Sequence, residues 1–459
     1  MNPIAPSDLY AFTAPRIFDG EKTWVDHAVL VENGVVRAIA PASQIPASAR
    51  LWSQPGCTIL PGLIDTHAHF MRWQGPLFLA YGVTTIRDTG NAPDWILERR
   101  GEWKNNLWPR LLCTGPLLDG PFPIHPWVSR RCASAAEAVC AVRETAGSGV
   151  DGIKLYVGLD PVWLPAMAAE SHRAGLKISM HCGAGGVLAA AEVGVDESFH
   201  LDGVMPDVWP SAPPGWLELW GLPEFAAMND PQRRLADEIT RLGMTVTPTL
   251  AYWDSQVCIR RPGFGHSEEA RLIPPVLIEW RSGVSGGSAG YGQWQRALAA
   301  AQHFVGLLLE RGARVLAGSD TPCGPVAPGV SLWRELDLLT QSGMSPEQAL
   351  RSATSAAADF LNQPGLGRLA AGSSADLVLV GGNPLEGIPL NPAILLVVQN
   401  GVVHHPQALL NASIHASQSI LEDRDPWSLQ FKAHRPVRTR RQPGEPLPPQ
   451  TSPGCENLA

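Results

Sequence analysis

Two histidines separated by one residue follow an apolar run in the first part of the chain. The run, residues 58–64, reads as a buried strand and leads into the sequence DTHAH at residues 65–69. Because side chains alternate between the two faces of a strand, His67 and His69 project from the same side. Two imidazoles so placed can bind one metal ion. The spacing alone is a weak signal, and an accidental match is the alternative reading.

Four further residues with useful chemistry stand at or near the ends of later apolar segments. They are Lys154, His181, His200 and Asp320. Each also has an ordinary structural explanation, such as a lysine that reaches solvent from a strand end or an aspartate in a turn or helix N-cap. A lysine ammonium has no acceptor atom and cannot bind a metal ion, so Lys154 would first need a chemical change.

An alternation of strands and helices must position these residues. Eight segments read as strands, ending near His67, Asp88, Thr114, Tyr156, His181, His200, Leu250 and Asp320. Helices are predicted at residues 134–146, 161–174, 233–241, 294–311 and 346–361. This alternation is typical of a parallel sheet, and eight strands are the number that a TIM (β/α)8 barrel requires. Barrel enzymes keep their chemistry at the carboxyl ends of the strands, where the candidate residues fall.

Short strand-like segments occupy both ends of the chain. They lie at residues 10–14, 27–32, 35–39, 375–380 and 394–398, with Asn-Gly hairpin signals at residues 33–34 and 400–401. We therefore predict one small β-domain formed by residues 1–59 and 362–414, a barrel at residues 60–361, and a C-terminal extension at residues 415–459. The Pro-rich last part of that extension, from about residue 431, is expected to be disordered.

Composition narrows the class of protein. Of the 459 residues, 45% are hydrophobic and 17% are charged, which is typical of a soluble globular chain with a large core. The net charge of −8 argues against nucleic acid as a partner. Eight cysteines without CxxC spacing predict reduced thiols. With no signal-peptide pattern and no apolar run of ~18 residues, we expect a cytoplasmic protein without a membrane partner.

Several motifs resemble those of the amidohydrolase superfamily, and in particular its imidazolonepropionase and prolidase-like branch. PGLIDTHAHF at residues 61–70 resembles the first metal motif, DGIK at residues 151–154 the lysine motif, and GSD at residues 318–320 the last metal motif. A C-terminal series that includes GLGRL at residues 365–369 and GNP at residues 382–384 resembles the same branch. The resemblance extends over about residues 10–405, with all six ligand positions filled in order.

The resemblance implies a metal-dependent hydrolase on a TIM barrel beside a β-sandwich. It implies that His67, His69 and Asp320 hold one divalent ion, that His181 and His200 hold a second, and that Lys154, carbamylated by CO2, bridges them. The donor set suits two Zn²⁺ ions per chain. Asp320 is then also the catalytic acid and base. A mononuclear centre and a non-catalytic binding scaffold are the alternatives.

The substrate is less closely defined. The Pro- and Trp-rich residues 201–230 follow the sixth strand, so we expect them to overhang the site, where Trp209, Trp216 and Trp220 favour bulky apolar groups. The alternative is that these tryptophans only pack the loop onto the barrel. His125 and Tyr252 are expected to bind the polar end of the substrate.

We therefore expect hydrolysis of an amide or related C–N bond in a small molecule with an apolar portion. A cyclic amide hydrolase or deaminase, an Xaa-Pro dipeptidase, and a carbamate or lactone hydrolase are alternatives. Prolidase-like members often carry a polar residue two places after the histidine that corresponds to His181, whereas this chain has Gly183. The oligomeric state stays open, with a homo-oligomer among the options.

Overall fold

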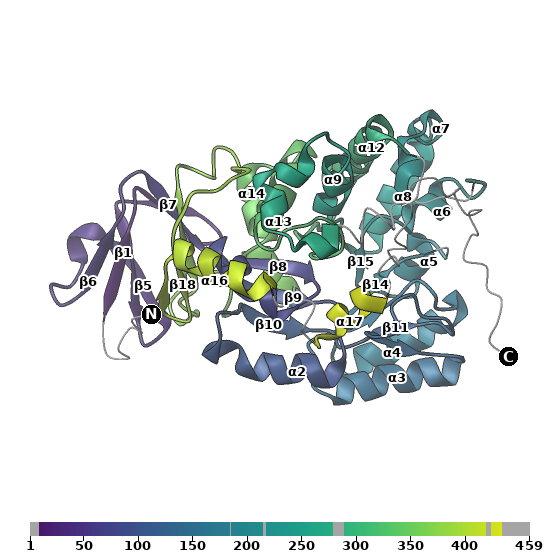
Figure 1. Ribbon diagram of the computed structural model, residues 1–459, viewed down its shortest axis with the longest axis horizontal. Coiled ribbons are helices and arrows are strands. Elements are labelled where there is room, and N and C mark those ends of the chain that lie inside the picture. Colours follow the sequence, from purple (N-terminus) through teal and green to yellow (C-terminus); the bar gives the residue numbers. More distant parts are fainter. Residues whose placement is uncertain (1–8, 184, 214–216, 279–288, 419–423, 434–459) are drawn as a thin grey trace, which may run out of the picture.

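The computed structural model describes residues 9–183, 185–213, 217–278, 289–418 and 424–433. A β-rich end and a larger α/β body lie side by side along the long axis of the molecule (Figure 1). No helix in these ranges is long and apolar enough to cross a membrane. The seven cysteines in the described ranges are free thiols, and all but Cys140 are buried.

The α/β body contains two parallel sheets. The first has the order β10-β9-β8 and consists of β8 (Leu63–Ala68), β9 (Val83–Asp88) and β10 (Arg110–Cys113). The second has the order β12-β11-β13-β14-β15-β16 and consists of β11 (Leu117–Asp119), β12 (Ser129–Arg131), β13 (Ile153–Leu155), β14 (Ile178–His181), β15 (Glu197–Phe199) and β16 (Thr245–Thr247). All neighbouring strands are parallel, as the alternating pattern predicts.

Backbone hydrogen bonds connect the two sheets at both sides. On one side, the backbone N of Asp151, just before β13, donates to the carbonyl of Cys113 in β10. At the opposite side, Val246 of β16 donates to Arg314 O, and Thr66 of β8 donates to Ala317 O. The predicted eighth strand, ending at Asp320, is present only as single bridge positions. Two parallel sheets are thus assigned, and closure into one barrel stays a prediction.

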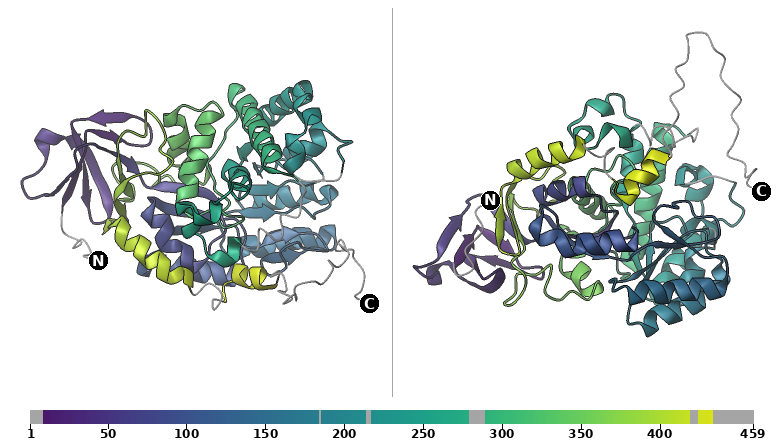
Figure 2. Two further views of the ribbon diagram at one scale, coloured as in Figure 1. Left: turned by 45° about the horizontal axis from the view of Figure 1, so that its top comes forward. Right: turned by 60° about the horizontal axis from the view of Figure 1, so that its bottom comes forward.

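The helices of the α/β body cover the sheets or occupy the connections between their strands (Figures 1 and 2). Those between or after the strands are α1 (Gly75–Ala80), α2 (Pro93–Glu102), α3 (Ala135–Gly147), α4 (Leu164–Arg173), α5 (Val187–Glu192), α8 (Asn229–Arg241), α12 (Tyr291–Glu310), α13 (Val330–Gln341), α14 (Pro346–Ser352) and α15 (Ser355–Phe360). The predicted cap of α3 is present, because Ser134 Oγ accepts from Glu137 N at 3.2 Å.

Two predictions about helix and strand boundaries were wrong. The segment predicted as one helix at residues 346–361 is two helices, because the carbonyl of Ala353 accepts a hydrogen bond from Ile64 in β8. The strand predicted to end near Leu250 ends at Thr247. Thr249 then adopts a left-handed conformation, φ 52°, and α9 (Leu250–Cys258) begins.

The connection at residues 201–230 is partly helical. It contains α6 (Val204–Val208), a 3-10 helix, η5 (Leu217–Gly221), and α7 (Pro223–Ala226). The following long connection contains α10 (Glu268–Arg271). The described parts of both connections therefore contain short helices.

The β-rich end has two further sheets. One has the order β5-β4-β1-β6 and consists of β1 (Tyr10–Thr13), β4 (His27–Glu32), β5 (Val35–Pro41) and β6 (Arg50–Ser53). The other has the order β19-β18-β17-β7-β2-β3 and consists of β2 (Arg16–Phe18), β3 (Thr23–Val25), β7 (Cys57–Pro61), β17 (Leu377–Gly381), β18 (Ile394–Gln399) and β19 (Val402–His404). Both sheets contribute to one apolar cluster that includes Phe12, Val29, Ile59 and Leu379.

Strands from both ends of the chain therefore share a sheet, as the sequence predicts, although the exact domain boundaries stay a prediction. β7 pairs antiparallel with β17 and runs directly into β8, which carries His67. Gly62 marks the junction, where a Cβ atom would overlap the Thr84 side chain.

The C-terminal extension differs from its prediction. Helix α16 (Pro406–Gln418) leads toward α17 (Pro426–Ala433), and α17 lies against the α/β body (Figure 2). Residues 431–433, expected within a disordered tail, thus belong to a helix. The rest of the predicted tail, residues 434–459, lies outside the described residues.

A buried ion pair joins a strand of the first parallel sheet to a strand of the second. Arg87 donates to Glu197 at 2.8 Å, and the same carboxylate accepts from Ser179 Oγ at 2.6 Å and Thr247 Oγ1 at 2.7 Å. Glu197 has no exposed surface, and Arg87 is buried with it. The pair thereby links β9, β14, β15 and β16.

We predict that Glu197→Gln lowers the free energy of unfolding by about 3–5 kcal/mol, because it leaves the Arg87 charge buried without a carboxylate. Denaturant titration of the purified protein measures the loss. The matched control is Glu238→Gln, which breaks an exposed pair with Arg241 and should cost less than about 1 kcal/mol. Equal losses in the two variants would contradict the structural role of the buried pair.

Candidate metal site

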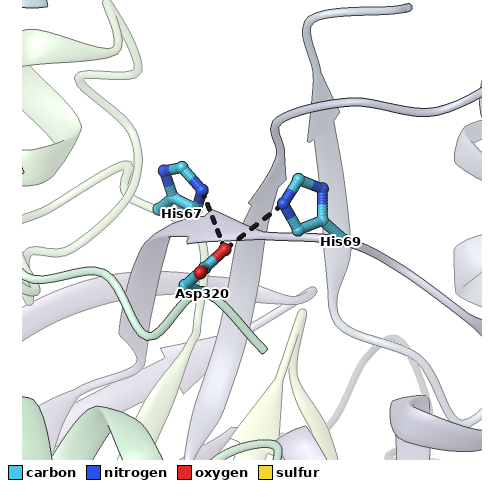
Figure 3. A group of neighbouring side chains, drawn as sticks. All are labelled: His67, His69 and Asp320. Carbon is cyan, nitrogen blue, oxygen red and sulfur yellow. Dashed lines mark ion pairs between the residues drawn. The ribbon is translucent and has the colours of Figure 1, made fainter. Parts of the chain in front are cut away.

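His67, His69 and Asp320 form the tightest group of candidate ligands. Their ligand atoms all lie within 4.8 Å of one another, and all three residues are buried. Asp320 Oδ1 lies 3.2 Å from His67 Nε2 and 3.3 Å from His69 Nε2. Figure 3 shows both rings turned toward this one oxygen. The predicted same-face placement of the two histidines in and after β8 is therefore present.

Backbone and side-chain hydrogen bonds hold Asp320 in this position. Asp320 N donates to His67 O at 2.8 Å, and the residue has a left-handed backbone, φ 60°. Beside it, Ser319 donates to the buried Asp65 carboxylate from both N, at 3.0 Å, and Oγ, at 2.6 Å. Burial raises the pKa of Asp65 to about 7, although the bonds from Ser319 oppose the shift.

The ring nitrogens of these histidines suit metal ligation. Among the described residues, no hydrogen-bond partner is found for either ring nitrogen of His67 or for Nδ1 of His69. Burial holds the pKa of His67 well below its usual value, so the ring is neutral. Burial also lowers the pKa of His69, but Cys323 and Asp320 outweigh it and raise that pKa to about 10. The groups that favour a proton on His69 equally favour a metal cation there.

His181 and His200 stand next to this group at the ends of β14 and β15. The His200 ring centroid lies 4.7 Å from that of His67 and 4.3 Å from that of His181. His200 Nδ1 is 2.7 Å from Thr249 Oγ1, which fixes the ring and leaves Nε2 for other contacts. His181 Nε2 lies 3.3 Å from a carboxylate oxygen of Asp202.

Lys154 is buried in β13. Its Nζ lies 3.7 Å from the centroid of the Phe199 ring, and in the described part of the chain no carboxylate lies within ion-pair distance of it. Burial lowers the pKa of Lys154 to about 7, which makes the neutral amine accessible near neutral pH. The alternative of a lysine that reaches solvent is wrong, because only 1% of Lys154 is exposed.

One cavity of about 600 Å³ contains all of the candidate residues. Those lining it are His67, His69, His125, Lys154, His181, His200, Tyr252 and Asp320. The His125 ring lies 5.6 Å from Tyr156. Tyr252 is buried in α9, where Ser255 Oγ donates to its carbonyl.

The three tryptophans of residues 201–230 have different positions. Trp220 lines the cavity and is buried against Trp253, with ring centroids 5.2 Å apart. Trp209 packs against the main apolar cluster, and Trp216 lies outside the described residues. Trp220 thus lines the cavity and also packs residues 201–230 onto the rest of the protein. The two roles considered for it from the sequence are compatible.

Several cavity residues are absent from the sequence prediction. They are Tyr156, Asp202, Cys323, Trp427 and Gln430. Trp427 lies far beyond the last recognised motif at residues 382–384, yet its ring centroid lies 4.6 Å from that of His69. The Asp425-Pro426 pair before it is a helix-start signal, since proline is favoured in the first turn, and it could have identified α17.

This arrangement supplies nitrogen and carboxylate donors around one point in a largely apolar cavity. Such a donor set binds a divalent first-row metal ion. A carboxylate between two imidazoles can also accept a proton from a water molecule beside it.

Comparisons with known proteins agree with this chemistry. Residues 58–408 match the amidohydrolase family, and residues 9–52 match the NagA composite domain. An imidazolonepropionase from Anaeromyxobacter dehalogenans (strain 2CP-1 / ATCC BAA-258) is 39% identical over 102 residues, which are 21% of this chain and 24% of that protein. The chain thus matches about a quarter of that curated relative's length.

Solved structures with a similar fold include bottromycin amidohydrolase, with a TM-score of 0.70 and 24% identity over 94% of this chain and 91% of that one. A Xaa-Pro dipeptidase with bound methionine has a TM-score of 0.64 and 17% identity over 87% of this chain and 100% of that one. The family match covers well over half of the sequence, and the His-His-Asp group lies within it. The chain therefore belongs to the amidohydrolase family.

Proposed function

We propose that this protein is a metal-dependent hydrolase that cleaves an amide or related C–N bond in a small molecule with an apolar portion. The observation that carries the proposal is the buried His67, His69 and Asp320 group, in which both ring nitrogens of His67 and Nδ1 of His69 lack hydrogen-bond partners among the described residues. The (β/α)8 barrel is part of the same proposal. The backbone hydrogen bonds that connect the two parallel sheets at both sides support it.

Two Zn²⁺ ions are the proposed cofactors. His67, His69 and Asp320 would hold one, His181 and His200 the other, with carbamylated Lys154 between them. Carbamylation forms a bond from the neutral Lys154 Nζ to the carbon of CO2, and a proton leaves the nitrogen. The product is an anionic oxygen donor at a position where the unmodified lysine offers none. The pKa of about 7 at this buried amine supports the reaction near neutral pH.

A bound divalent ion supplies Lewis acidity, which acidifies a water molecule and polarises the scissile carbonyl. The protein's own contribution is to position and move protons. We assign Asp320 as the catalytic acid and base: its carboxylate takes the proton of the attacking water and gives it to the leaving nitrogen. Burial of the group keeps bulk water from competing for these hydrogen bonds.

The lining of the cavity supports a neutral, partly apolar substrate. Its apolar members include Ile124, Val157, Met205, Leu219 and Trp220. Among the described lining residues, Lys154 is the single lysine or arginine. A free substrate carboxylate would therefore find no separate cation there, which speaks against a dipeptide substrate. His125 and Tyr252 are proposed to bind the polar end of the substrate.

A mononuclear hydrolase is the second candidate. The observation in its favour is that His67, His69 and Asp320 already form a compact three-ligand site without His181 or His200. Three protein ligands and one open position are typical of catalytic single-zinc sites. Metal analysis distinguishes the two candidates, since they require two ions and one ion per chain.

We predict that Lys154→Met abolishes turnover and lowers the metal content, because the bridging oxygen donors are lost while the apolar packing on Phe199 is kept. Elemental analysis and a turnover assay on the folded protein measure both effects. Lys177→Met, at a half-exposed lysine outside the cavity, is the control and should change neither. A Lys154→Met protein with full metal content and near wild-type rate would refute the bridging role.

Asp320→Asn should reduce kcat by roughly two to four orders of magnitude, the range expected for a positioned acid and base. The fold should be kept, because the amide preserves the size of the side chain. Unchanged turnover of the metal-loaded variant would rule out the proton-transfer role.

Matched N-acyl substrates test the substrate class. We expect kcat/KM to be about tenfold or more higher for an aromatic acyl group than for an acetyl group, because the larger group fills the apolar part of the cavity. The comparison uses one leaving group throughout, so that only the acyl portion changes. Equal or better values for the short group would contradict the assignment.

A further inference from the structure

Helix α17 brings a residue from outside the family-matched region to the candidate metal site. The match ends at residue 408, whereas Trp427 lies well beyond it. Only 1% of Trp427 is exposed, and its indole lines the cavity. The ring centroid lies 4.6 Å from that of His69 and 5.3 Å from that of His125. A tryptophan of the C-terminal extension therefore forms part of the wall beside the proposed ligands.

Two contacts of the indole, and the bonds of Asp425 before its helix, fix the position of Trp427. Its Nε1–H donates to Gly90 O at 2.8 Å. The buried carboxylate of Asp425, just before α17, accepts from the backbone N of Arg72 at 3.1 Å and from its Nε at 2.9 Å. Within α17, the Phe431 ring centroid lies 5.9 Å from that of the indole. The ring thus has an anchored position in the wall.

One anchor, Arg72, lies on the segment that carries His69, and the other, Gly90, is tied to that segment through Asp88. Arg72 follows His69 by three residues in the sequence. Gly90 lies next to the Asp88 loop, and the Asp88 carboxylate accepts from Phe70 N at 2.7 Å and from Gly90 N at 3.2 Å. The position of Trp427 is therefore set relative to His69 rather than by the outer surface of the molecule.

We propose that Trp427 is a specificity-determining residue, whose indole forms the apolar surface that receives the non-reacting, planar portion of the substrate. The proposal rests on the proposed function and deepens it. Leu117 and Cys323, which line the same cavity, belong to the apolar cluster that contains Trp427. A flat indole in such a wall favours aromatic over short aliphatic groups. Stacked or edge-on aromatic pairs gain a stabilisation beyond that from the buried area alone.

The alternative is that Trp427 only holds α17 in place. Trp333 provides a matched control, because it is also buried and its Nε1–H donates to a backbone carbonyl, that of Tyr81, at 2.9 Å. Trp333 is not among the residues that line the cavity. Replacing either tryptophan by phenylalanine removes one indole and one hydrogen bond, but only Trp427→Phe changes the wall of the site.

The test uses the full-length, metal-loaded protein and two metal-binding probes, acetohydroxamate and phenylacetohydroxamate. Calorimetry gives the ratio of their dissociation constants, and the kcat/KM ratio for N-acetyl and N-phenylacetyl amides gives a second measurement. Both ratios are independent of the fraction of active protein in the sample. Trp427→Leu should reduce the preference for the aromatic probe by about tenfold, and Trp427→Phe by less. Trp333→Phe should leave both ratios unchanged.

Unchanged ratios in Trp427→Leu and Trp427→Phe, with wild-type binding of both probes, would overturn the role of Trp427 alone. An equal change in Trp333→Phe would also overturn it, because the effect would then be general. A wild-type protein that binds neither hydroxamate would instead overturn the proposed function, and this inference with it.

Discussion

The candidate site depends on the hydrogen bonds that join β8 to residues 317–321. Three backbone bonds of 2.8–3.2 Å connect Thr66, His67 and His69 to this segment. The buried Asp65 carboxylate adds bonds to Ser319, a residue 254 positions away in the sequence. A buried carboxylate is costly unless it is hydrogen-bonded, so these contacts make the pairing specific. They hold the Asp320 oxygen between two imidazoles that belong to another part of the chain.

Two buried basic side chains lie near the same aromatic ring but differ in whether a carboxylate pairs with them. The Arg87 guanidinium and the Lys154 Nζ lie 4.9 Å and 3.7 Å from the centre of Phe199. Arg87 has the Glu197 carboxylate as its partner and serves to link strands. Lys154 has no such partner among the described residues, so burial lowers its pKa instead. This difference is the basis for the carbamylation proposed at Lys154.

Much of the fold and the site could be predicted from the sequence because their signals are local. The placement of His67 and His69 on one face follows from the alternation of side chains along any strand. The helix cap at Ser134 follows from its spacing to Glu137. What could not be predicted depends on distant contacts. The helix break at Ala353 follows from a bond to Ile64, and the wall formed by Trp427 follows from contacts with Arg72 and Gly90. The sequence pattern of residues 415–433 does not indicate which distant residues they contact.

The pairing of β7 with β17 has a consequence for how the chain folds. Residues 57–61 meet residues 377–381, so one edge of β7 has no native partner until most of the protein has been synthesised. Contacts this far apart in sequence form slowly, and an unpaired strand edge can associate with other chains. On a ribosome, β7 can pair early only with β2, at its other edge. During translation there is therefore an interval in which this edge of β7 lacks its native partner and is open to pairing with another chain.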